Sequence, residues 1–150
     1  MSMDPQRKAY LIEAAVEAQP YPPEAALAKA WLEANLDQYD DVDFQKHVGP
    51  GIEVGNEYAD YIQRMAYHAT RKRADLVMYH DLTATIVEFK DHVDYAAVRQ
   101  VLEYADLWRH SPIDPPVVAL VVVGRTGDAG IKETAAAQGV TVELLSPDLP

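Results

Sequence analysis

The sequence predicts an α/β protein of three layers, with helices on both faces of a mixed β-sheet. The run Val117 to Val123 is apolar and mostly β-branched, which is typical of a central strand covered on both faces. Residues 73–79 and 84–90 are two further strand-like runs separated by a short turn, as in a β-hairpin. Segments with apolar residues at helical spacing lie before, between and after these strands.

The N-terminal third is expected to be helical and to pack on the rest of the chain. Apolar residues recur at helical spacing over residues 5–18 and 24–36, with a proline-rich connector between them. The acidic stretch 37–43 is turn-like, and it lacks the glycine and the terminal glutamate of an EF-hand calcium loop. We therefore expect residues 1–50 to form a helical extension packed on a core of residues 51–150, within a single domain.

The core elements are predicted from local patterns. Gly124-Arg125-Thr126-Gly127 follows the buried strand, and it lacks the ending of a P-loop and the GxGxxG spacing of a dinucleotide site. We interpret it as a turn. In chain order, the elements expected after the break at 49–51 are a helix over 52–65, a short strand over 67–70, the hairpin, a helix over 95–109, the buried strand, a helix over 128–138 and a strand over 140–145.

Composition restricts the chemistry. The chain has 150 residues, of which 49% are hydrophobic, enough for one well-packed domain. It has no cysteine, which excludes disulfides, thiolate metal sites and a cysteine nucleophile. No apolar run approaches the roughly 20 residues that span a bilayer, so we expect a cytoplasmic protein, or one of the virion or host cytoplasm if a phage encodes it.

The hairpin brings charged residues together. If its turn centres on Asp81 and Leu82, Asp75 faces Glu88, and two like charges in such a pair are destabilising unless something offsets them. Lys90 projects from the same face, because side chains alternate along a strand. Two carboxylates beside a lysine could hold Mg²⁺ and position a water. The alternative is a solvent-facing hairpin whose acids merely flank a lysine.

The basic run Arg71-Lys72-Arg73 lies just before Asp75. The net charge of −11 argues against binding of a polyanion by the whole surface, so any nucleic-acid contact would be local. These three cations could receive phosphates. They could equally be a solvated strand entry that balances nearby acids.

Several of these residues resemble the motif of the PD-(D/E)XK nuclease superfamily. Asp75 precedes the tripeptide Glu88-Phe89-Lys90 by a thirteen-residue step, and a helix follows directly. Gln100 and Tyr104, four residues apart on one face of that helix, are similar to the QxxxY motif of the branch that contains bacterial recombination exonucleases.

The resemblance covers about residues 51–145. Gly55-Asn56-Glu57, within the helix expected there, is similar to the early glutamate that many members contribute to the metal site. Two departures from the family pattern are Ala74, which stands where the motif has proline, and the acidic net charge. The resemblance implies a restriction-endonuclease-like core with a mixed central sheet.

It also implies residue roles and a cofactor. One or two Mg²⁺ or Mn²⁺ ions would be held against the scissile phosphate, and Lys90 would position the attacking water. Gln100 and Tyr104 would orient Lys90 or contact a phosphate, although a helix-surface amide and a core tyrosine remain the alternatives. The metal ligands implied are Asp75, Glu88, the backbone carbonyl of Phe89, and Glu57.

Two functions follow as expectations. The first is a metal-dependent nuclease, or deoxyribonuclease, that hydrolyses phosphodiester bonds and contacts DNA through the basic run. The second is a nuclease-fold structural or assembly module without catalytic activity, for example in a phage particle or multiprotein complex. In that case the N-terminal helices would dock a protein partner or a second copy of the chain.

Overall fold

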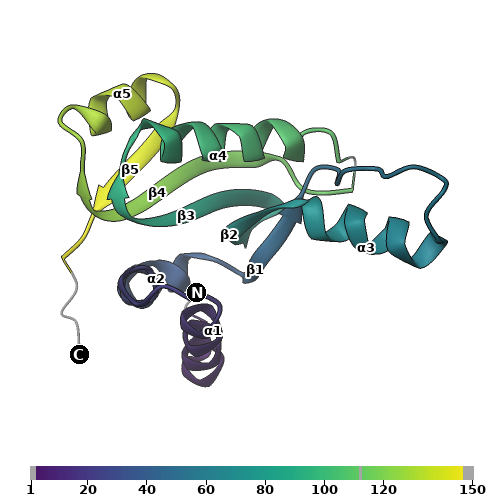
Figure 1. Cartoon of the computed structure of the whole chain (residues 1–150). Helices are drawn as coiled ribbons and strands as arrows, with labels where there is room; N and C mark the ends of the chain where they lie inside the picture. Colours follow the sequence, from purple (N-terminus) through teal and green to yellow (C-terminus); the bar gives the residue numbers. More distant parts are fainter. Residues whose placement is uncertain (1–2, 112, 147–150) are drawn as a thin grey trace.

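The computed structural model describes residues 3–111 and 113–146, and it confirms the predicted three-layer α/β architecture. A five-stranded mixed sheet has helices on both faces (Figure 1). In chain order the elements are α1 (Pro5–Glu17), α2 (Pro22–Asn35), η1 (Leu36–Gln38), β1 (Asp41–Val48), α3 (Asp60–Thr70), β2 (Lys72–His80), β3 (Thr83–Val93), α4 (Tyr95–Trp108), β4 (Val117–Gly127), α5 (Ile131–Ala137) and β5 (Val140–Leu144).

The strands lie in the sheet in chain order, β1-β2-β3-β4-β5. Neighbours are antiparallel from β1 to β3 and parallel from β3 to β5. The parallel connections cross over through α4 and α5, which cover one face of the sheet, while α1 and α2 cover the other (Figure 1). The strand expected at Val117–Val123 is therefore central, as predicted.

The predicted hairpin is present with the predicted turn. In the β2–β3 ladder, Leu76 lies opposite Val87 and His80 lies opposite Thr83. Asp81 and Leu82 have φ angles of 45° and 63°, the left-handed conformations that a two-residue hairpin turn of type I′ requires at both positions.

The two faces of the sheet carry separate apolar cores. Phe89 of β3 packs toward α2, where its ring meets Trp31 edge-on with centroids 6.4 Å apart. Ile86 of the same strand packs toward α4 with Val98 and Val101. Burial on both faces fixes the register of β3, because a slip of one residue would exchange the two faces.

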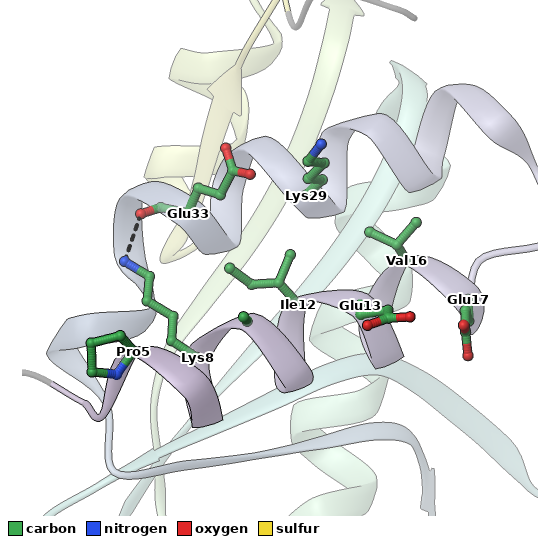
Figure 2. Close-up of a pocket in the computed structure, with 9 residues that line it drawn as sticks. Pro5, Lys8, Ile12, Glu13, Val16, Glu17, Lys29 and Glu33 are labelled. Atoms are coloured by element: carbon green, nitrogen blue, oxygen red, sulfur yellow. Dashed lines mark hydrogen bonds between the residues drawn. The ribbon is translucent and has the colours of Figure 1, made fainter.

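The N-terminal helices leave an open hollow between them. Ile12 and Val16 of α1 line a cavity of about 650 Å³. Figure 2 shows both side chains beneath α2. Lys8 reaches across to donate a hydrogen bond to the Glu33 carbonyl (3.1 Å) and pairs with Asp37 (3.0 Å). Along the residues described, none of the helices combines the length and apolarity needed to cross a bilayer.

An edge strand, β1, forms where we expected turn and helical extension. Phe44 lies opposite Leu76 and Val48 lies opposite Lys72 in the antiparallel ladder with β2. The acidic stretch before it is a single 3-10 turn, and the strand begins at Asp41. We did not predict β1 because it contains aspartate, glutamine and lysine. A strand at the edge of a sheet accepts such residues, whereas a central strand does not.

Helix α3 begins at Asp60 rather than at residue 52. Gly55-Asn56-Glu57 lies in a turn instead of a helix, and the Tyr58 N–H donates to the Gly55 carbonyl (3.2 Å). Residues 67–70, expected as a strand, are the last turn of α3, where the Thr70 hydroxyl bonds the Ala66 carbonyl (2.8 Å). Gly55 and Asn56 favour a turn over a helix at residues 55–57.

Strand β4 continues through Gly124-Arg125-Thr126-Gly127, where the sequence predicted a turn. A Cβ on Gly124 would lie 2.4 Å from Val93 Cγ2 and 2.8 Å from the Lys90 carbonyl oxygen. Glycine stands there because β3 and β4 approach closely, and not because the chain turns. The following helix begins at Ile131, directly after Gly130 with φ 76°, rather than at residue 128.

Candidate active site

The regular pairing of β2 with β3 stops before Asp75 and Glu88, where side-chain carboxylates accept the hydrogen bonds. The Asp75 N–H donates to Glu88 Oε1 (2.7 Å), and the Phe89 N–H donates to Asp75 Oδ2 (3.0 Å). The last regular pair before this point is Leu76 with Val87. Side-chain carboxylates thus replace backbone acceptors where the two strands begin to separate. The sequence correctly placed these two acids beside each other.

Burial and the neighbouring acid change the pKa of Glu88. Glu88 is only 3% exposed, and its pKa is raised well above the usual 4.5, first by burial and then by the charge of Asp75. The Asp75 N–H and the Lys90 ammonium oppose that rise. The charged form of Glu88 is therefore disfavoured, and a bound cation would relieve that cost.

Lys90 lies on the same side of β3 as Glu88, as predicted from the alternation of side chains. Its charge lowers the pKa of Glu88, which places the ammonium within electrostatic range of that carboxylate. Lys90 also lines a cavity of about 1010 Å³ together with Lys72, Arg99 and Gln100. Lys90 is thus both within electrostatic range of Glu88 and part of the lining of an open hollow.

Gln100 and Tyr104 share a face of α4, as their spacing predicted. The Gln100 amide donates a hydrogen bond to the Tyr104 hydroxyl (2.5 Å). Tyr104 is 3% exposed and packs in the core between α4 and the sheet. Its pKa is raised by burial and then by the charges of Glu88 and Asp75. The tyrosine is therefore a buried neighbour of the acids, while the partly exposed Gln100 faces the hollow.

Glu57 does not join the hairpin acids. It is exposed, it lies in the turn before α3, and among the described residues it forms no three-ligand group with Asp75 and Glu88. Its carboxylate folds back beside Gly55, where a Cβ would meet it at 2.0 Å.

Glu24, in the first turn of α2, is the third acid near the hairpin. Its pKa is raised by burial and then by the charge of Asp75, and it is lowered by Lys90. The side chain thus lies within electrostatic range of both hairpin residues. Sequence reasoning missed it, because only the packing of α2 on β3 brings it there. Its one local signal is a lone acid after the Pro22-Pro23 helix start.

Among the described residues, no third acid or histidine lies close enough to Asp75 and Glu88 to complete a group of three ligands for one ion in this conformation. The single group of three that meets this condition in the described chain lies at the hairpin turn, where Asp40, His80 and Asp81 each offer one ligand atom within 4.8 Å of the others. All three residues are exposed, and this group could hold a metal ion. Sequence reasoning missed this cluster, because β1 was needed to bring Asp40 beside the turn.

The three residues of the basic run before Asp75 have different neighbours. Arg71 donates to the Gly49 carbonyl (2.8 Å), and Lys72 pairs with Glu103 of α4 (2.8 Å). Arg73 instead lines a hollow beside α3 with His47 and Arg64. The three cations therefore do not form one surface.

Comparison with protein-family models, with curated proteins and with solved structures gave no match. Any functional conclusion therefore rests on the geometry of the chain itself. Its most specific feature is the arrangement of Asp75, Glu88 and Lys90 at the point where β2 and β3 separate.

Proposed function

We propose that the chain is a metal-dependent nuclease that hydrolyses phosphodiester bonds in DNA, and that it belongs to the PD-(D/E)XK superfamily. The observation that carries this proposal is the Asp75–Glu88 pair, in which each carboxylate accepts a hydrogen bond from the opposite strand and Lys90 lies within electrostatic range. A buried carboxyl group of raised pKa, here that of Glu88 beside Asp75, is costly to a purely structural hairpin.

The residues around the pair fit a hard divalent cation. Carboxylate oxygens are the ligands that Mg²⁺ and Mn²⁺ prefer, and the excess of acids over cations favours a positive ion. Asp75 and Glu88 would hold it, with the Phe89 carbonyl as a backbone ligand and Glu24 as a further acid within electrostatic range of Asp75. The bound ion would lower the pKa of a water and neutralise charge on the scissile phosphate.

The chain's own residues supply the remaining requirements. Lys90 is placed to orient a water and to offset negative charge that develops on phosphate oxygens. Gln100, fixed by its hydrogen bond to Tyr104, presents its remaining polar atoms toward the hollow that Lys90 lines. Arg99 lines the same hollow, where a phosphate backbone would meet positive charge.

The test is cleavage of labelled linear, nicked-circular, single-stranded and branched DNA with Mg²⁺ or Mn²⁺. We expect cutting by the wild type and its loss in Asp75→Asn and Lys90→Ala. Matched controls are Asp106→Asn on α4 and Lys132→Ala on α5, both exposed side chains away from the pair. No cutting of any DNA by the folded protein would instead favour the non-catalytic assembly module.

A further inference from the structure

Positive charge in this acidic chain gathers beside α3. We call the α3 surface the cavity of about 600 Å³ that is lined chiefly by His47, Tyr61, Arg64, Met65, His68 and Arg73. Two of these residues are arginines, in a chain of net charge −11. The surface is therefore a local exception to the overall charge, as binding of a polyanion requires.

The two arginines of the α3 surface are available to a ligand. Both are exposed, and neither forms an ion pair with any residue that the structure describes. Lys46 and Lys72, by contrast, are paired with Asp43 and Glu103. Cations without acidic partners are free to contact phosphates.

Helix α3 adds an apolar face that no other element covers. None of its side chains is buried in the described chain, and Tyr61 and Met65 are 58% and 66% exposed. Figure 1 shows α3 projecting away from the end of the sheet. An exposed aromatic ring among cations is the combination on which single-stranded nucleic acids bind, with bases stacked on the ring and phosphates beside the cations.

The α3 surface is continuous with the candidate active site. His47 lies opposite Arg73 in the β1–β2 ladder, and Gln45, two residues before His47, donates to Asp75 Oδ1 (3.3 Å). Arg73 is likewise two residues before Asp75, a separation of about 7 Å along a strand. A chain of phosphates held at the α3 surface would thus pass close to Asp75.

We propose that the α3 surface binds a single-stranded segment of nucleic acid, with a base stacked on Tyr61 and phosphates at Arg64 and Arg73. Its role in leading that strand to Asp75 rests on the proposed nuclease function, whereas binding itself does not. An unpaired base is needed to reach the Tyr61 ring, and the acidic remainder of the chain opposes the broad contact that a duplex would make.

The test is fluorescence anisotropy of a labelled oligothymidylate in EDTA, which measures binding without cleavage. We expect Tyr61→Ala to weaken binding about tenfold, the lower part of the range for loss of one stacked base. Arg64→Gln should weaken binding and reduce the salt slope by about 1. Tyr10→Ala and Arg7→Gln, exposed residues of α1, are the matched controls and should bind as the wild type does.

Three outcomes would overturn the proposal. Unchanged binding by Tyr61→Ala and Arg64→Gln would remove the α3 surface as the site. Tighter binding of a matched duplex, insensitive to Tyr61→Ala, would exclude the single-stranded ligand. Self-association that Tyr61→Ala abolishes, without oligonucleotide binding, would make the surface an interface between copies. Failure of the nuclease proposal alone gives a different result, which is normal binding with no cleavage in Mg²⁺ or Mn²⁺.

Discussion

Each of the carboxylates of Asp75 and Glu88 accepts a hydrogen bond from the backbone of the strand that carries the other. Both carboxyl groups therefore have a structural partner even without a cation, which offsets part of the cost of placing two acids side by side in a partly buried hairpin. The arrangement also keeps the two side chains in place before any ion arrives. This is the preorganisation that a metal site on rigid strands needs.

We expect a divalent cation to stabilise the folded chain. A ligand that binds only the folded state at a free concentration of about 100 times its Kd adds about 2.7 kcal/mol to the free energy of unfolding. Thermal unfolding with increasing Mg²⁺ or Mn²⁺ should therefore show a rising Tm. In Asp75→Asn the rise should disappear, because one of the two central ligands is lost.

The cluster at the hairpin turn requires a control in this experiment. Asp40, His80 and Asp81 could themselves hold an ion and contribute to the Tm shift. Asp81→Asn should keep the Mg²⁺-dependent shift, since it removes a carboxylate of the turn and leaves Asp75 and Glu88 unchanged. A shift lost in Asp81→Asn and kept in Asp75→Asn would move the metal site to the turn.

In metal-free buffer we expect stability to fall as pH rises. Burial and Asp75 raise the pKa of Glu88 in the folded state, so between the usual 4.5 and that raised value the folded chain binds more protons than the unfolded chain. The free energy of unfolding therefore decreases with pH across this window. Glu88→Gln should remove the Glu88 contribution, so its stability relative to the wild type should grow with pH in urea titrations.

The glycine within β4 gives a test of the packing between strands. Gly124→Ala should lower the free energy of unfolding by about 1–3 kcal/mol, because the new Cβ meets Val93 and the Lys90 carbonyl. Gly55→Ala is the matched control, since its Cβ would meet only the flexible end of the Glu57 side chain. Equal urea midpoints for the two variants would contradict the close approach of β3 and β4.

Patterns close in sequence predicted the parts of this fold that depend on neighbouring residues. The hairpin register, the helix that carries Gln100 and Tyr104, and the central strand at Val117 all follow from alternation or helical spacing. The edge strand β1 did not, because its stability comes from pairing with β2 rather than from its own composition.

The candidate site likewise contains residues that the sequence predicted and one that it did not. Asp75, Glu88 and Lys90 lie on one hairpin, so alternation along the strands was enough to group them. The third acid was assigned to Glu57 by resemblance to the early glutamate of the PD-(D/E)XK superfamily, within a helix that the turn at 55–57 replaces. Glu24 reaches the site only through the packing of α2 on Phe89, a contact between residues far apart in the chain.

We expect Glu24, rather than Glu57, to support the metal site. Glu24→Gln keeps the size of the side chain and removes a charge within electrostatic range of Asp75 and Lys90. If Glu24 supports the metal site, cleavage should fall about 10- to 100-fold, as for residues that support metal ligands. Glu57→Gln, in an exposed turn, should cut DNA at the wild-type rate. Initial rates over a range of Mn²⁺ concentrations measure both, and a larger loss in Glu57→Gln would restore the assignment made from sequence. Higher Mn²⁺ should recover part of the Glu24→Gln activity, because the variant would lose metal affinity while Lys90 stays in place.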